Sequence, residues 1–172
     1  MKILDFAIDV ERAERDLYDR LAACCQHDGV RSIFRMAADE EGKLLKKLKM
    51  LKANPQQNAL ELNSLSALPT KLRKLQSGSC ELLDQNLVRD DLSGYNYILK
   101  TEQLLLNLYI NLKKRENDPN AKELLDLILQ EKQSEIDRIH LIFDFVNAPN
   151  EYLATAEFSN IGEFHNFGRD EG

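Results

Sequence analysis

The sequence repeats itself at a constant offset of 91 residues, and this repeat constrains the fold more than any other feature of the chain. When 91 is added to a position in the first part of the chain, apolar residues fall on apolar residues without a gap, as when Phe34 becomes Leu125. Glu11 becomes Glu102 in the same frame. Such self-similarity is the signature of one supersecondary unit that occurs twice. The chain is therefore predicted to fold around a pseudo-twofold axis.

Each copy of the repeat is predicted to form a pair of helices. Within residues 2–26, apolar side chains recur every three or four positions, a period that places them on one face of a helix. The same period occupies residues 30–53, 90–117 and 119–146. A helix of 25 residues is roughly 37 Å long. Four such helices predict an all-α fold.

Glycine and proline mark the expected ends of these helices. Gly29, in the stretch HDGV, is expected to take a left-handed conformation between the first two helices. Asn54-Pro55 and Ala148-Pro149 are expected to end the second and fourth helices, because a residue that precedes proline disfavours the helical conformation. The stretch NDPN is expected to turn the chain between the third and fourth helices.

The connection between the second and third helices is long, covering residues 54–88, whereas the other two are short. A short helix over residues 69–76 is predicted inside it. Two helical hairpins joined by one crossover are a recognised form of the four-helix bundle. Residues 1–146 are thus predicted to form this bundle. The aromatic-rich residues 147–172 are predicted to form a tail that packs on the bundle or on the second subunit of a homodimer.

The composition limits the partners and the compartment. The 172 residues carry a formal charge of −6, whereas binding to nucleic acid needs concentrated Lys and Arg. The start of the chain becomes charged too early for a secretory signal, and no apolar run reaches the roughly 18–20 residues that span a membrane. The three cysteines, Cys24, Cys25 and Cys80, contain no Cys-x-x-Cys pair and are expected to be reduced. We therefore expect a cytoplasmic protein that binds neither nucleic acid nor membrane.

Several charged residues lie on the predicted inner faces of the helices. The inward polar positions at the middle of the predicted bundle are Glu11, Glu14, Glu41, Glu102, Lys132 and Glu135. Leu44 lies one turn after Glu41, and its partner in the repeat is Glu135. A carboxylate in a core is costly unless it is paired, protonated or coordinated. This set therefore marks the candidate functional site.

The sequence resembles the rubrerythrin-like branch of the ferritin-like superfamily. The stretches that carry the resemblance are DVERAERDLY and KTEQLLLNLY, each with a Glu followed seven residues later by Tyr, together with IFRMAADEEGKLLKKL and the tail sequence NEYLATAEFSN. The resemblance implies a ferritin-like four-helix bundle. In that family each half supplies one Glu from its first helix and a Glu-x-x-His from its second. These ligands hold two iron ions that react with peroxide or oxygen.

The resemblance is only partly carried by the ligand positions of this chain. The family's glutamates are matched by Glu11, Glu41 and Glu102. Leu44 stands where the first His is expected, Lys132 where a Glu is expected, and Glu135 where the second His is expected. No rubredoxin segment is present to serve as electron donor, so the donor is unknown. The resemblance also suggests that Tyr18 and Tyr109 bond the site carboxylates or transfer electrons. The alternative is a pair of core tyrosines whose hydroxyls are satisfied.

Three hypotheses for the site follow. In the first, Glu11, Glu41, Glu102 and Glu135, joined by Glu14, bind one or two Fe or Mn ions and support at most weak redox chemistry with peroxide or oxygen. In the second, the ammonium of Lys132 takes over the charge of a lost metal, bridging Glu41, Glu102 or Glu135, and a proton is shared among the remaining acids. The bundle is then non-catalytic, and the site is structural or holds one weakly bound ion. In the third, the helical frame is off by one residue, and Glu131, Lys132 and Glu135 face solvent.

Overall fold

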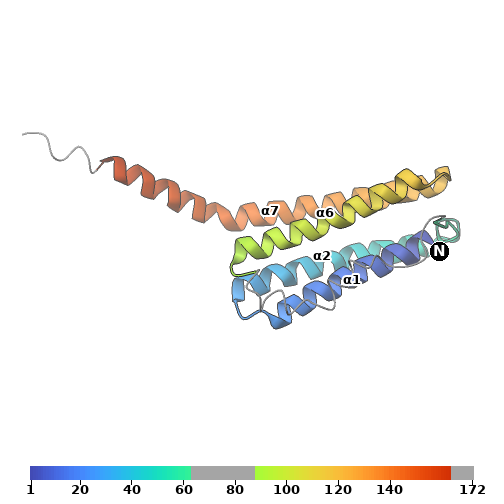
Figure 1. Cartoon of the computed structure of the whole chain (residues 1–172), viewed down its shortest axis with the longest axis horizontal. Helices are drawn as coiled ribbons and strands as arrows, with labels where there is room; N and C mark the ends of the chain where they lie inside the picture. Colours follow the sequence, from blue (N-terminus) through green and yellow to red (C-terminus); the bar gives the residue numbers. More distant parts are fainter. Residues whose placement is uncertain (63–87, 164–172) are drawn as a thin grey trace, which may run out of the picture. The chain divides into compact units, whose positions relative to one another are not determined.

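The protein is all-α in a computed structural model that describes residues 1–62 and 88–163, with side chains described up to residue 144. Its long helices are α1 (Ile3–Cys24), α2 (Asp28–Lys52), α6 (Asp91–Arg115) and α7 (Pro119–Glu163), as shown in Figure 1. Extended pairing in these ranges is limited to an isolated bridge between Lys2 and Glu61. No helix in the same ranges combines the length and the apolar character needed to cross a membrane. The predicted all-α class is confirmed.

The helices α1 and α2 form a hairpin that is joined by residues 25–27. Their facing sides are apolar, and residues such as Phe6, Leu17, Phe34 and Leu48 are almost completely buried. These side chains recur with the helical period that the sequence shows. Burial of this apolar stripe is what makes an amphipathic helix stable in a protein.

Gly29 does not take the left-handed conformation predicted for it. It lies in the first turn of α2, where its φ is not positive. A Cβ at this position would clash with the carboxylate of Asp91 at the start of α6, so glycine makes room for the first turn of that helix. The chain enters α2 instead through His27, whose backbone is extended. The glycine therefore reflects a close approach of two helices rather than an unusual backbone conformation.

Side-chain caps begin the next two helices. The short helix α3 (Pro55–Asn58) follows α2, and Asn54 Oδ1 accepts a hydrogen bond of 3.0 Å from the backbone N–H of Gln56. Asn54-Pro55 thus marks the end of α2, as predicted. At the start of α6, Asp90 Oδ1 accepts a hydrogen bond of 2.7 Å from the backbone N–H of Ser93, while Ser93 Oγ accepts one of 3.0 Å from the N–H of Asp90. This reciprocal arrangement is a capping box.

The course of α7 contradicts the prediction that Ala148-Pro149 ends the fourth helix. The backbone stays helical as far as Glu163. The ring of proline fixes φ near −65°, which is itself a helical value. Proline inside a helix removes one backbone hydrogen bond and kinks the helix, so it does not always end it. Residues 147–163, which were predicted to be part of a tail, therefore belong to α7.

The chain divides into two units, Met1–Ile136 and Asp137–Gly172. In the first unit, one apolar cluster draws on all four long helices, with members such as Leu4, Leu45, Leu112 and Leu125. This cluster holds the helices around a common interior, which is where the predicted polar positions lie.

Some predictions concern parts of the chain outside the described residues or are corrected by them. The helix predicted over residues 69–76 and the last part of the tail, residues 164–172, lie outside the described residues. Cys25 is a buried free cysteine, but Cys24 is disulfide-bonded, so the prediction of reduced thiols is wrong for Cys24. Cys24 is the last residue of α1, whereas Cys25 follows it with an extended backbone, so the two adjacent side chains meet different surroundings.

Candidate functional site

Six charged side chains meet in the interior of the unit Met1–Ile136. They are Glu11 and Glu14 from α1, Glu41 from α2, Glu102 from α6, and Lys132 and Glu135 from α7. Each of the six is 0% exposed. The spacing of three residues, within α1 and again within α7, places two charged side chains on one face of each helix. The structure thus brings together every charged residue that the sequence predicts to point inward.

The ammonium of Lys132 lies at the centre of the five carboxylates. Its Nζ is 2.7 Å from Glu41 Oε1 and 2.7 Å from Glu102 Oε2. It is 2.8 Å from Glu14 Oε2 and 3.0 Å from Glu11 Oε2. The contact with Glu135 Oε2 is longer, at 3.2 Å. One cation therefore contacts an oxygen of every carboxylate in the cluster.

The hydrogen bonds of Lys132 are unevenly shared among these carboxylates. An ammonium group has three donors, and they point to Glu11, Glu14 and Glu41. The Oε2 atoms of Glu102 and Glu135 contact the cation without a hydrogen bond. Glu135 Oε1 and Glu41 Oε2 also have no hydrogen-bond partner. The cluster consequently holds more acceptors than its donors can satisfy.

Two buried tyrosines supply the remaining donors. Tyr109 donates a hydrogen bond of 2.5 Å to Glu11 Oε1, and Tyr18 lies 3.0 Å from Glu102 Oε1 and 3.1 Å from Glu14 Oε1. Burial, and then the neighbouring carboxylates, raise the pKa of both phenols well above the ordinary value. Both tyrosines therefore keep their protons and act as donors to the site carboxylates, which was one of the two roles that the sequence left open.

Five carboxylates around one ammonium leave four formal negative charges uncompensated when all the groups are ionised. Burial raises the pKa of Glu14 and Glu41 well above the ordinary value, and it raises the pKa of Glu135 to about 7. Burial alone would lower the pKa of Lys132, but the carboxylates, Glu102 foremost, raise it well above the ordinary value. The cluster therefore holds a permanent ammonium together with carboxyl groups that retain protons at neutral pH.

The contacts of Tyr18 identify one of these protons. A phenol has one hydrogen to donate, yet the Tyr18 oxygen lies within hydrogen-bond distance of both Glu14 and Glu102. Both contacts are satisfied when Tyr18 donates to Glu102 and a protonated Glu14 donates to the Tyr18 oxygen. This assignment agrees with the raised pKa of Glu14.

The hypothesis that the helical frame is off by one residue is wrong. Lys132 and Glu135 are 0% exposed, whereas the Glu131 side chain is 34% exposed and pairs with Lys47 at 2.5 Å on the surface. The two histidines in the described part of the chain, His27 and His140, are both exposed. No histidine among the described residues therefore lies in the cluster.

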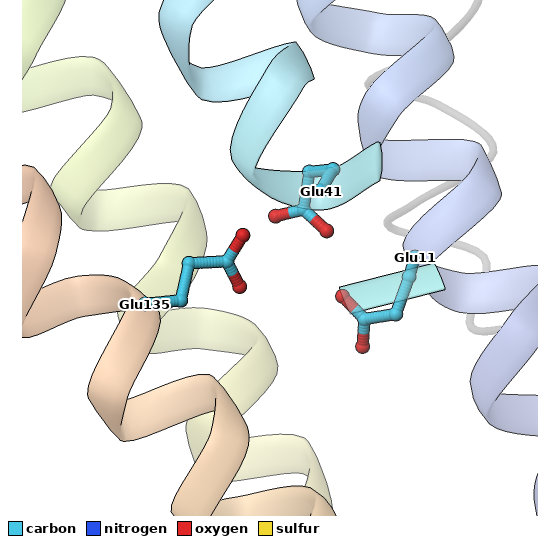
Figure 2. A group of neighbouring side chains, drawn as sticks. All are labelled: Glu11, Glu41 and Glu135. Atoms are coloured by element: carbon cyan, nitrogen blue, oxygen red, sulfur yellow. The ribbon is translucent and has the colours of Figure 1, made fainter. Parts of the chain in front are cut away.

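The cluster offers two groups of three carboxylates whose oxygens lie within 4.8 Å of one another. One group is Glu11, Glu41 and Glu135, and Figure 2 shows these side chains converging from α1, α2 and α7. The other group is Glu14, Glu41 and Glu102. Carboxylate oxygens are suitable ligands for hard cations. The two groups share Glu41. Considered without Lys132, the carboxylates could therefore supply ligands to two ions.

Lys132 and Leu44 make this arrangement a poor fit for a pair of metal ions. Metal–oxygen distances in protein sites are about 2.0–2.6 Å, but the carboxylates converge on Nζ at 2.7–3.2 Å. An ammonium at this point cannot ligate a metal and repels a cation nearby. Leu44, at the position of one expected histidine, is 2% exposed and belongs to the apolar cluster. As they stand, the residues present do not fit the two-iron centre of the family that the sequence resembles.

Sequence reasoning missed part of what Lys132 does. It expected Lys132 to bridge Glu41, Glu102 or Glu135, whereas two of its three hydrogen bonds go to Glu11 and Glu14 of α1. The signal available was Glu14 itself, an inward acid whose counterpart in the predicted repeat is a leucine, Leu105.

Comparison with models of protein families, with curated proteins and with solved structures gives no match for this chain.

Proposed function

We propose that the chain is a ferritin-like four-helix bundle in which Lys132 serves as a built-in cation, and that it acts as a non-catalytic structural or interaction module. The observation that carries the proposal is the contact of Lys132 Nζ with an oxygen of all five buried carboxylates. The resemblance of DVERAERDLY and KTEQLLLNLY to the rubrerythrin-like branch supports the fold part of the proposal.

Lys132 does in this proposal what metal ions do in a carboxylate centre. It cancels negative charge in the interior and links four helices through one group. Glu11 and Glu14 bring α1 to it, Glu41 brings α2, and Glu102 brings α6, while Lys132 itself comes from α7. A covalently attached cation cannot be lost by dilution or chelation. The bundle therefore does not depend on metal supply.

The same contacts argue against redox chemistry. The ammonium has no accessible redox state, and no described side chain in the cluster is a histidine that could hold iron in the family's manner. The role of the protein then lies in its surface and its stability, so we expect partners to bind to the outside of the bundle.

A second candidate function, a metal-binding bundle of the rubrerythrin type, is favoured by one observation. Glu41 Oε2 and Glu135 Oε1 are buried without a hydrogen-bond partner, and the cluster carries excess negative charge. A cation of Fe or Mn near these atoms would relieve both. It would also need the ammonium of Lys132 to move away.

Metal analysis of the purified chain separates the two candidates. The protein is produced in medium that contains Fe and Mn, and its metal content is measured by plasma mass spectrometry. We expect far less than one ion per chain and a melting temperature that a chelator does not change. Near-stoichiometric Fe or Mn, with a melting temperature that falls on chelation, would reject the Lys132 proposal in favour of the metal-binding candidate.

A further inference from the structure

Two of the most exposed large apolar side chains of the described residues occupy matching positions in the repeat. Met50 on α2 is 69% exposed, and Leu141 on α7, which lies 91 positions later, is 68% exposed. The next most exposed, Leu92, is at 55%. A single exposed apolar side chain is ordinary on a protein surface, so what distinguishes these two residues is the opposite charge of their surroundings.

Met50 borders a basic groove. The groove has a volume of about 400 Å³ and lies between α1 and α2, with Leu45 and Ala53 among its lining residues. Its charged residues are Arg15, Lys46 and Lys49. Gly42, also in the lining, has no side chain, and the Arg15 guanidinium lies 3.8 Å from the place that a Cβ would take. We call this surface the basic groove. Its lining combines apolar side chains with three positive charges.

Leu141 lies on an acidic ridge of α7. Asp137 precedes it by four residues and Asp144 follows it by three, so all three share one helix face, and all three are exposed. The two aspartates are about 10 Å apart along the helix. We call this surface, Asp137–Leu141–Asp144, the acidic ridge.

We propose that the chain associates with itself, with the acidic ridge of one copy docked in the basic groove of a second copy. Leu141 would bury its side chain beside Met50, and Asp137 and Asp144 would pair with the cations of the groove. The opposite charges of the two surfaces, each beside an exposed apolar side chain, are the reason to choose a second copy as the occupant. Since the two surfaces differ, the contact is heterologous and not a self-complementary patch. The proposal uses none of the residues around Lys132, so it stands or falls separately from the proposed function.

Charge reversal in the full chain tests the pairing. The groove variant carries Lys46→Glu and Lys49→Glu, and the ridge variant carries Asp137→Lys and Asp144→Lys. Sedimentation velocity over a range of concentrations measures the self-association of each variant, and circular dichroism checks that each one folds. We expect each variant alone to self-associate at least about tenfold more weakly than the unchanged chain, because like charges then face each other.

The decisive measurement mixes the two variants. Each variant has one surface of reversed charge, so the reversed groove of one meets the reversed ridge of the other, and association should return to near the original strength. The exposed residue Leu104 on α6 provides a matched control, and Leu104→Ser should leave association unchanged. A chain that is monomeric at every concentration would overturn the proposal. So would association that ignores both charge reversals, or variants that associate no better together than alone.

Discussion

Replacement of Lys132 by methionine is the most direct test of the charge arrangement in the core. Methionine has nearly the shape of lysine but neither charge nor donors, so Lys132→Met removes the cation with little change in packing. Three hydrogen bonds, from Nζ to Glu11, Glu14 and Glu41, are lost together with two further ion contacts. Loss of one partner from a buried ion pair costs about 3–5 kcal/mol, because the remaining charges stay buried without compensation. We expect a loss of this size in the free energy of unfolding at pH 7.

Chemical denaturation measures this loss, and thermal unfolding should follow it. In a chain of this size, 1 kcal/mol corresponds to about 2–4 °C in melting temperature, so the expected decrease is roughly 6–20 °C. Lys47→Met is the matched control, because Lys47 carries the same charge, pairs with Glu131 and has a side chain that is 51% exposed. An exposed pair contributes at most about 1 kcal/mol. A loss for Lys132→Met no larger than that of the control would refute the reasoning.

The pH dependence of the Lys132→Met variant provides a second readout. Without the ammonium, ionised carboxylates in the core are disfavoured further, so the folded variant binds protons more tightly than the unfolded chain. Stability gained in this way is complete below the unfolded carboxyl pKa of about 4.3 and is lost as pH rises. The deficit of the variant relative to the unchanged chain should therefore shrink as pH falls toward 5. A deficit that does not vary with pH would contradict this explanation.

Three further outcomes are expected. Burial raises the pKa of Glu135 to about 7, so the unchanged chain should lose stability as pH rises from about 4.3 through 7. Denaturation at several pH values should show that Glu135→Gln removes on the order of 3 kcal/mol of this pH-dependent change in the free energy of unfolding. Tyr109→Phe removes the donor to Glu11 Oε1 and should cost about 1–3 kcal/mol in urea unfolding, whereas no loss would mean that water replaces the hydroxyl. The triple variant Leu44→His, Lys132→Glu and Glu135→His completes the ligand set of the family that the sequence resembles. Plasma mass spectrometry of this variant should find about two Fe or Mn ions per chain. If it stays free of metal, the proposed ferritin-like arrangement is in doubt.

The sequence predicted the interior of the molecule better than its ends. The inward direction of Glu11, Glu41 and Glu102 follows from periodicity alone, because the helical period places them on the same face as the buried apolar residues. The end of α7 could not be predicted in this way. Pro149 disfavours a helix locally, but a helical backbone can continue through a proline. The conformation of Gly29 was predicted wrongly for a related reason. Glycine permits both a positive φ and a close approach of another segment, and only the position of Asp91 shows that the second applies here.

The details of the cluster lay beyond prediction for a different reason. Periodicity gives the face on which a side chain lies, but it does not give the position along a long flexible side chain at which its charge sits. Lys132 has four methylene groups, so its ammonium could have reached several carboxylates. The three-dimensional arrangement settles that it reaches all five, and that Glu11 and Glu14 of α1 receive two of its three hydrogen bonds.

One lysine among five carboxylates also implies that protons are part of the core. Under the proposed ferritin-like arrangement, a lysine in place of a ligand glutamate changes the charge at that position by two, which is as much as one divalent ion supplies. Glu14, which matches no expected ligand, and Glu135, which stands where a histidine is expected, add negative charge back. In a core without metal the balance comes from protons, and the raised pKa of Glu14, which contacts Tyr18, places one of them there. Because a proton is released as pH rises and a metal ion is displaced as pH falls, the two candidate cores have opposite pH dependences of stability. A chain that loses stability as pH rises from 5 to 8 therefore has a core balanced by Lys132 and protons, whereas one that gains stability over the same range holds a metal.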